Sequence, residues 1–270
     1  MSTGNMYVLG HAECELERLA KQARLVDPVT RRFFLTAGIT EGMRVLDVGS
    51  GAGHTAMLLA DIVGPSGEVV GADLSLPAIE WAARRVSDAG ITNVSFRHGD
   101  PSAMDLGRFD AIAGRYVLMF MPDPSSTLAR LCGQLRPSGI VVFHEPDWDD
   151  ARCVPSSPVY LQVCGWIRQA LRDSGADCVL GTKLASVFVR AGLPLPSLGL
   201  DALIAAGPGA CDVIRLVTDL ATTLRPDIER LGLVPAGSPD FAELAESILS
   251  SIGPHGTAVG RAEIGAWTTI

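Results

Sequence analysis

The stretch Val45–Ala60, "VLDVGSGAGHTAMLLA", decides the fold of this chain. An apolar, strand-like run carries Asp47, glycines follow at positions 49, 51 and 53, and a helix-like run comes next. Glycine lacks a Cβ atom, so a turn of this kind lets the backbone approach a ligand closely. The pattern therefore predicts a ligand-binding turn between a strand and a helix.

Two phosphate-binding patterns do not match this turn. A P-loop needs a lysine followed by serine or threonine directly after its last glycine, and no Lys-Ser or Lys-Thr pair follows Gly53. A dinucleotide fingerprint places its third glycine at position 54, which is His54 here. The turn therefore indicates a ligand that it does not hold through phosphate.

Strand-like and helix-like segments alternate on both sides of the turn, separated by turn signals such as "GPSG" at 64–67 and "RPSG" at 136–139. This alternation predicts an α/β fold with a mainly parallel sheet covered by helices on both faces. The seven expected strands are 44–48, 68–73, 93–97, 109–113, 139–143, 197–205 and 257–270, and the expected helices are 14–26, a second one from Pro28 to Gly38, 54–62, 76–89, 123–135, 156–174, 181–192, 209–232 and 238–252.

Composition limits the classes of protein to which the chain can belong. It has 270 residues, 47% of them apolar, and a net charge of −8, which disfavours nucleic-acid binding. No segment reaches the roughly 18 uninterrupted apolar residues of a transmembrane helix, and the N-terminus does not read as a signal peptide. Six scattered cysteines form no C-x-x-C pair and indicate a reducing compartment. We therefore expect a cytoplasmic, globular protein.

The turn and its surroundings resemble class I S-adenosylmethionine-dependent methyltransferases. In that family a strand-borne acidic residue precedes G-x-G-x-G, and the next strands end in acidic residues, as in "VVGADLS" with Asp73 and "FRHGDPSAM" with Asp100. "FDAIAGRYVLMFMPDP" and "LRPSGIVVFHEPDW" continue the order, so the resemblance covers residues 40–145. It implies a Rossmann-like fold and S-adenosylmethionine as cofactor, bound by Asp47, Gly49, Ser50, Gly51, Gly53, Asp73, Leu74, Gly99, Asp100, Pro101 and Arg115.

A carboxylate such as Asp73 can accept hydrogen bonds from both ribose hydroxyls, and the glycines leave room where a Cβ atom would crowd the ligand. Both Asp73 and Asp100 also suit a helix N-cap, which is the structural alternative for each.

The segment "HEPDWDD" at 144–150 supplies the candidates for catalysis. His144 titrates near neutral pH and could act as a general base, with Glu145 and Asp147 orienting it or binding a polar substrate. The alternative is a solvated acidic loop with His144 partly packed. His11 and Tyr7 precede the first helix and could also reach the site.

Arg115 ends the fourth expected strand and could bind the cofactor carboxylate or an acidic substrate, or form a structural salt bridge. Catechol-type methyltransferases hold Mg²⁺ with an aspartate at this point. A cation there disfavours the metal-dependent variant, so we expect no metal, although the acidic run after the fifth strand leaves that variant open.

The chain is expected to form an N-terminal helical lid, residues 1–40, and a cofactor-binding domain, residues 41–270, with cap helices at about 150–180 and 208–254. Trp148, Tyr160 and Trp166 lie in the cap region and could line an acceptor pocket or form the core of the cap. Trp81 reads as helix–sheet packing. A cap of this size suits a small molecule that must be enclosed.

The function expected from the resemblance is methyl transfer to a hydroxyl or amine of a small organic molecule, as in bacterial secondary metabolism. One alternative keeps the fold and a structurally bound cofactor but catalyses a cyclisation or isomerisation. A regulatory ligand-binding protein and a nicotinamide dehydrogenase are two more functions that the fold could support. The expected partner is a small-molecule acceptor, without nucleic acid or membrane, and a homodimer is left open.

Overall fold

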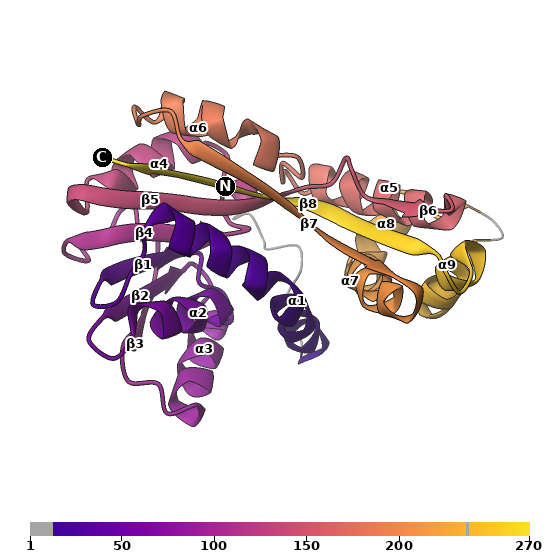
Figure 1. Cartoon of the computed structure of the whole chain (residues 1–270), viewed down its shortest axis with the longest axis horizontal. Helices are drawn as coiled ribbons and strands as arrows, with labels where there is room; N and C mark the ends of the chain where they lie inside the picture. Colours follow the sequence, from indigo (N-terminus) through magenta and orange to yellow (C-terminus); the bar gives the residue numbers. More distant parts are fainter. Residues whose placement is uncertain (1–12, 236–237) are drawn as a thin grey trace. The chain divides into compact units, whose positions relative to one another are not determined.

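The computed structural model describes residues 13–235 and 238–270, which form two compact units (Figure 1). The sheet unit comprises Ala23–Pro146, Val179–Asp201 and Glu263–Ile270. The helical unit comprises the described residues up to Gln22, with Asp147–Cys178 and Ala202–Ala262. No helix among the described residues is long and apolar enough to cross a membrane.

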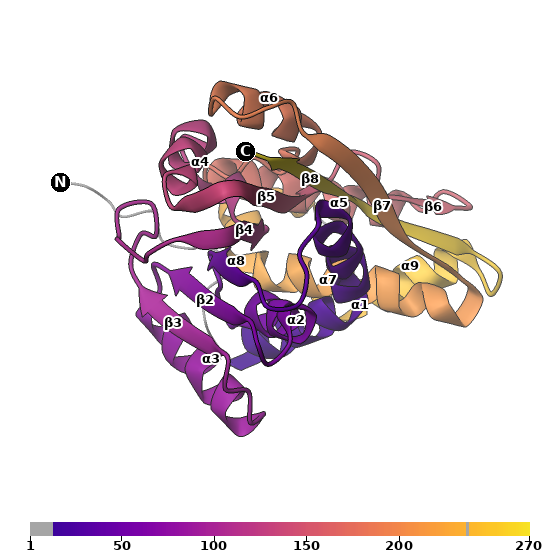
Figure 2. The ribbon, with the colours of Figure 1, turned by 60° about the vertical axis from the view of Figure 1, so that its left-hand side comes forward.

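The first half of the sheet unit alternates strands and helices as expected. Its elements are β1 (Arg44–Val48), α2 (His54–Val63), β2 (Glu68–Asp73), α3 (Leu76–Asp88), β3 (Val94–His98), β4 (Phe109–Arg115), the short 3₁₀ helix η1 (Leu118–Phe120), α4 (Pro124–Cys132) and β5 (Leu135–Asp147). The strands follow the order β3-β2-β1-β4-β5 (Figure 1), and all four neighbouring pairs are parallel. Figure 2 shows β3, β2, β4 and β5 of this sheet from another side. The order reverses direction between β1 and β4, and ligands of open α/β sheets bind at the carboxyl ends of the strands at such a point.

Strand β5 is longer than the expected strand at 139–143, because it continues through the "HEPD" segment to Asp147. Every residue from Gly139 to Asp147 is buried, including the charged ones. The expectation of a solvated loop at this point is therefore wrong for residues 144–147. His144 and Glu145 form hydrogen bonds with groups of other segments. Because these bonds satisfy the buried polar side chains, the strand can continue past the point where the polar residues begin.

The last strands complete the sheet. β8 (Thr257–Thr269) is the neighbour of β5, and β7 (Ser197–Ala206) pairs with β8. The strand that we did not expect is β6 (Arg152–Val154), which pairs with the first residues of β8 in antiparallel orientation within the helical unit. It brings the total to eight strands among the described residues, where seven were expected. Three residues between turn-forming segments are too short to show a strand periodicity.

The first helix is continuous and contains residues of both units. We expected two helices separated at Pro28, but α1 (Glu13–Ala37) runs through this proline. A proline inside a helix costs about 3 kcal/mol. The helix buries Val26, Val29, Phe33 and Phe34, and each large apolar side chain contributes roughly 1.5–3 kcal/mol, which outweighs that cost.

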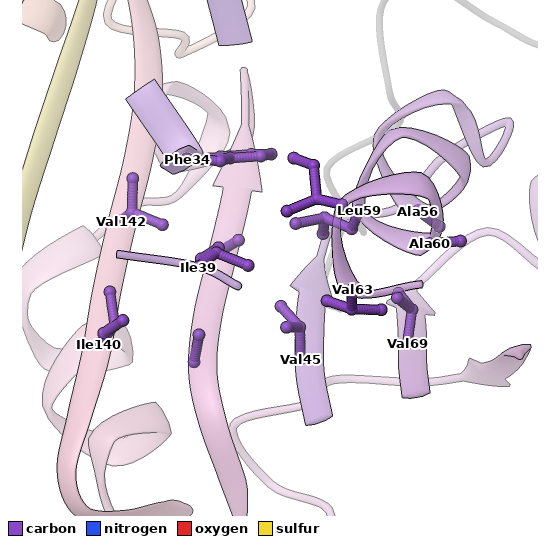
Figure 3. Packing of buried hydrophobic residues seen from close by; sticks show 13 residues of the cluster. Phe34, Ile39, Val45, Ala56, Leu59, Ala60, Val63, Val69, Ile140 and Val142 are labelled. Atoms are coloured by element: carbon purple, nitrogen blue, oxygen red, sulfur yellow. The ribbon is translucent and has the colours of Figure 1, made fainter. Parts of the chain in front are cut away.

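The core of the sheet unit brings α1, α2 and the sheet together. Figure 3 shows Phe34 near Leu59 of α2 and Val142 of β5, with Ile39, Val45 and Val63 in the same cluster. Residues 23–37 of the proposed lid thus belong to the sheet unit, and Phe34 among them is part of this core. A lid function for residues 1–40 stays a prediction.

The helical unit contains α5 (Pro158–Asp173), α7 (Ala210–Thr223), α8 (Arg225–Arg230) and α9 (Leu244–Ile252), while α6 (Leu184–Arg190) belongs to the sheet unit. Tyr160 is fully buried and its hydroxyl donates to the Val259 carbonyl at 3.0 Å. Trp166 stacks on Phe241, and the Arg261 guanidinium lies 5.1 Å from the centre of the Trp148 ring. These three aromatic residues therefore form the core of this unit, as the structural alternative predicts. A capping function of the unit stays a prediction.

Trp81 on α3 is only half-buried, and the Arg84 guanidinium lies over its ring at 5.8 Å from the centre. The expected packing of this side chain against the sheet stays a prediction.

Candidate active site

The glycine turn joins β1 to α2 and is bonded to the neighbouring strand. The Gly49 and Ser50 amides both donate to the Ala72 carbonyl of β2, at 2.8 and 3.0 Å. Gly49, Gly51 and Gly53 have φ angles of 67°, 49° and 81°, in the left-handed region that favours glycine. The turn thus depends on all three glycines for its backbone conformation.

The reason for the glycines differs in part from the expected one. A Cβ atom on Gly49 would lie 2.9 Å from Val117 Cβ, and one on Gly53 would lie 3.0 Å from Ala82 Cβ. These two glycines are therefore needed for contacts within the protein. Of the three glycines, only Gly51 would accommodate a Cβ atom without a close contact, because the nearest atom, the Gly49 carbonyl oxygen, would lie 4.0 Å away. Room for a ligand beside Gly51 stays a prediction.

This difference separates two substitutions. Gly49→Ala combines left-handed strain of about 1–2 kcal/mol with an overpacking cost of about 1–3 kcal/mol. Gly51→Ala incurs the strain alone. Urea unfolding should therefore show a clearly larger loss of unfolding free energy for Gly49→Ala. Equal losses would contradict the packing argument.

Asp73 connects the glycine turn to the start of α3. Its Oδ2 accepts the Gly51 amide at 2.9 Å, and its Oδ1 accepts the Ser75 amide at 2.8 Å. The side-chain N-cap of α3 is Ser75 itself, so Asp73 is not the cap. Leu74 is 73% exposed beside it, and the Gly99 amide donates to the Asp73 carbonyl. The structure thus gathers the ends of β1, β2 and β3 at one edge.

Asp100 and Pro101 follow Gly99 in this edge. The exposed Asp100 carboxylate accepts the Ser102 amide at 2.9 Å, and the Pro101 carbonyl accepts a hydrogen bond from Gln134. Asp100 therefore shapes its own loop, and its expected contact with adenine stays a prediction.

Buried polar atoms without partners cluster at the glycine turn. Asp47 Oδ1 and Oδ2, Ser50 Oγ and His54 Nε2 have no hydrogen-bond partner among the described residues. Burial raises the pKa of Asp47 to about 8, although the charge of Arg115 and the nearby Ala56 amide, which does not meet hydrogen-bond geometry, act in the opposite direction. Burial and the charges of Arg85 and Arg115 lower the pKa of His54 to about 3.

Buried polar groups in proteins are nearly always hydrogen-bonded, so this cluster calls for a ligand that supplies partners. S-adenosylmethionine has an ammonium group and hydroxyls that can donate to such acceptors. The residues of the turn therefore fit the cofactor that the resemblance implies.

Arg115 does not stand free at the end of β4. It donates to Asp27 of α1 at 2.6 Å and to the Thr30 hydroxyl at 3.0 Å, and its side chain is 6% exposed. The structural salt bridge is thus the arrangement that the structure shows. A direct contact of Arg115 with cofactor or substrate stays a prediction.

His144 is fully buried in β5, and both of its ring nitrogens have partners. Nδ1 lies 3.0 Å from Thr30 Oγ1, and Nε2 lies 2.9 Å from Glu263 Oε2 of β8. The Tyr116 hydroxyl donates to the same Glu263 oxygen at 2.6 Å. His144 therefore sits inside a hydrogen-bond network in which both ring nitrogens are engaged, and the expected direct role as a general base stays a prediction.

Local sequence patterns do not identify four residues of this network as site residues: Tyr116, Thr30, Asp27 and Glu263. Glu263 is 119 positions from His144, and no local spacing links the two. One signal was available, because an acidic residue inside the apolar final strand calls for a buried partner.

One carboxylate oxygen of Glu145 has a structural contact, and the expected role of this residue toward His144 or a substrate stays a prediction. Its Oε1 accepts the Val117 and Leu118 amides at 2.9 and 2.8 Å, so it fixes the turn after β4. Burial raises the pKa of Glu145 to about 8, against the lowering effect of these amides. Asp147 accepts the Asp149 amide.

Three expectations remain: that His11 or Tyr7 reaches the site, and that no metal is bound. His11 and Tyr7 lie outside the described residues. Within residues 13–235 and 238–270 there is no group of three or more His, Cys, Asp or Glu side chains that could hold a metal ion. The absence of a metal in the active protein stays a prediction.

Comparison with known proteins identifies relatives. A family model described as "Methyltransferase domain" matches residues 39–184, more than half of the chain. The arsenite methyltransferase of Aquipseudomonas alcaligenes is 35% identical over 116 residues, 40% of this chain and 34% of that protein. The nocamycin O-methyltransferase of Saccharothrix syringae is 35% identical over 121 residues, 44% of this chain and 43% of that protein. The chain thus spans less than half the length of these curated relatives.

Solved structures share the fold. The YcgJ protein of Bacillus subtilis aligns with a TM-score of 0.55 at 18% identity, over 90% of this chain and 97% of that one. The [4+2]-cyclase SpnF aligns with a TM-score of 0.52 at 19% identity, over 89% of this chain and 80% of that one. At this identity the likenesses show the Rossmann-like fold alone.

Proposed function

The chain belongs to the methyltransferase domain family, and on that premise we propose that it transfers a methyl group from S-adenosylmethionine to a hydroxyl or amine of a small organic molecule. The observation that carries the proposal is the cluster of unpartnered buried atoms of Asp47, Ser50 and His54 at a turn where a Cβ atom on Gly51 would meet no close neighbour. Relatives named for arsenite and for nocamycin support a small acceptor. Roles in secondary metabolism, in the cytoplasm or as a homodimer remain part of the proposal.

Residues of the turn and of the end of β2 contact different parts of the cofactor in this proposal. Asp73 presents a carboxylate at the end of β2 for ribose hydroxyls, and the Asp47 carboxyl presents acceptors beside the glycines. Gly51 allows the approach of the ligand to the backbone. When bound, S-adenosylmethionine supplies a methyl group on a positively charged sulfur. This sulfur is an excellent leaving group, because it leaves as a neutral thioether. The protein then has to align the acceptor, exclude water and take up any proton released.

Asp73→Ala tests the cofactor site directly. Hydrogen bonds to a charged group contribute about 1.5–3 kcal/mol, so the dissociation constant for S-adenosylmethionine should rise roughly 10- to 100-fold. Isothermal titration calorimetry on the purified protein measures this. Asp73→Asn should show a smaller loss, because one acceptor oxygen remains.

Asp110→Ala is the matched control. Asp110 accepts the Arg44 amide at 2.8 Å near the first residues of β1 and β4, away from their carboxyl ends. It should leave the dissociation constant unchanged. An unaltered dissociation constant in a folded Asp73→Ala variant would contradict the assignment of the site.

The alternative of a cyclisation or isomerisation makes a different prediction. Methyl transfer produces one S-adenosylhomocysteine for each product molecule, whereas a structurally retained cofactor is not consumed. Quantifying both compounds by mass spectrometry distinguishes the two reactions.

A further inference from the structure

Tyr116 stands at the point where the strand order reverses. It follows β4 directly, and the glycine turn follows β1, the parallel neighbour of β4. The two connections touch, because Val117 fills the space that a Cβ atom on Gly49 would need. Tyr116 is half-buried. Its place is therefore at the carboxyl edge where ligands of such sheets bind.

The backbone of Tyr116 is held in a costly conformation. Its φ angle is 55°, in the left-handed region, which costs a non-glycine residue roughly 1–2 kcal/mol. Its amide donates to the His144 carbonyl at 2.9 Å, and Glu145 holds the next two amides. Strained backbone that neighbouring contacts enforce is typical of functional sites.

The Tyr116 side chain begins a chain of hydrogen bonds that leads into the core. Glu263 Oε2 accepts the phenol at 2.6 Å and lies 2.9 Å from His144 Nε2. An ionised carboxylate only accepts, so His144 carries its proton on Nε2 in this arrangement. Both Glu263 and His144 are fully buried.

Thr30 lets His144 keep a partner in either charge state. Its hydroxyl lies 3.0 Å from His144 Nδ1 and 3.2 Å from the Val26 carbonyl, and it accepts from Arg115. It can donate to Nδ1 of the neutral ring, or accept from the cation while donating to Val26.

We propose that Tyr116 takes the proton that the acceptor loses and passes its own proton to Glu263, and that the acceptor atom is the oxygen of a neutral, weakly acidic hydroxyl. This inference rests on the proposed methyl transfer. The bond from methyl carbon to sulfur breaks as the bond to oxygen forms, and the O–H proton moves to Tyr116 Oη. The phenol proton moves to Glu263, which becomes a neutral carboxylic acid. His144 and Thr30 are positioning residues.

The charged groups around Glu263 are compatible with this role. Facing the network are Asp27 from α1, Arg115 from β4, and His144 and Glu145 from β5. Arg115 and Asp27 form an ion pair, so their charges largely offset each other. The pKa of Glu145, raised to about 8 by burial, keeps that carboxyl mostly protonated at neutral pH. Glu263 is the carboxylate that accepts the hydrogen bond of the phenol, at 2.6 Å, so it is placed to accept the phenol proton.

The acceptor class follows from this chemistry. A thiol ionises at lower pH than a hydroxyl and therefore needs less help from a base, whereas a hydroxyl has to lose its proton as it is methylated. A buried carboxylate behind a phenol is suited to the hydroxyl.

The test compares wild type, Tyr116→Phe and Glu263→Gln on phenols of graded acidity, each beside its thiol analogue, with methyl-labelled S-adenosylmethionine. Removal of a general base costs about 10²–10⁴-fold in rate. Both variants should lose at least 100-fold in kcat on phenols at pH 7 and little on thiols, with an unchanged Kd for the cofactor. The deficit should shrink as the pH approaches the pKa of each phenol, a change that a merely structural role would not produce.

Two further measurements keep the outcome interpretable. Tyr160→Phe removes a buried hydroxyl in the helical unit and should keep the wild-type pH profile. In the free protein, ¹⁵N NMR of the histidines should show His144 protonated on Nε2, with its resonance shifted by Glu263→Gln.

The outcomes separate this inference from the proposed function. Equal kcat and pH profiles in wild type and Tyr116→Phe would overturn the relay and leave methyl transfer standing. Methylation of thiols but of no hydroxyl compound would overturn the acceptor class. A wild-type protein that does not bind S-adenosylmethionine would overturn the proposed function itself.

Discussion

Replacing Asp47 with asparagine should flatten part of the pH dependence of stability between about pH 4 and about pH 8. Within this window the folded protein keeps a proton on Asp47 that the unfolded chain has released. The stability of the wild type therefore falls as the pH rises, by up to about 1.4 kcal/mol per pH unit from this group, and the contribution ends above pH 8. An asparagine side chain cannot ionise, so the variant lacks this slope.

Urea unfolding at several pH values from 5 to 8 measures the effect. Glu145→Gln is a parallel test. Burial raises the pKa of Glu145 to about 8 as well, so its replacement should also remove a part of the pH dependence with the same sign. A wild-type slope retained in full by the Asp47→Asn variant would show that Asp47 is already ionised in the folded protein.

Phe34→Ala should lower the unfolding free energy of the sheet unit by about 3–5 kcal/mol, the range for truncating a buried aromatic side chain. Phe34 is fully buried in the cluster with Leu59 and Val142 (Figure 3). The loss would show that this part of α1 belongs to the fold and is not a separable lid. Chemical unfolding followed by circular dichroism measures it.

Leu35→Ala is the neighbouring control on the same helix. Leu35 is 49% exposed, and substitutions of exposed side chains usually change stability by less than about 0.5 kcal/mol. A Phe34→Ala loss as small as that of Leu35→Ala would contradict the integration of α1 into the core.

Local patterns predicted most of the elements. The bounds of β1 and β2 agree with the expected ones, and α2 and α3 agree to within a residue at each end, because periodicity and turn residues act over a few positions. The same locality explains the errors. Pro28 read as a helix start, since the burial of Phe33 and Phe34 that offsets its cost depends on the sheet.

The candidate site also contains residues that local patterns could predict and contacts that they could not. Asp73 and the glycine turn could be predicted, because both follow strands that must end at the same edge of a parallel sheet. The contacts of Arg115 and His144 could not. Their partners Asp27 and Glu263 come from α1 and β8, at the two ends of the chain.

By itself, then, the sequence determined the alternating fold, the glycine turn and the membership in a methyltransferase family, since each is encoded in the spacing of neighbouring residues. Only the tertiary structure decided that His144 is enclosed, that Arg115 is paired and that Tyr116 reaches Glu263. The physical reason is that buried polar groups need partners, and folding supplies those partners from segments that no local spacing connects.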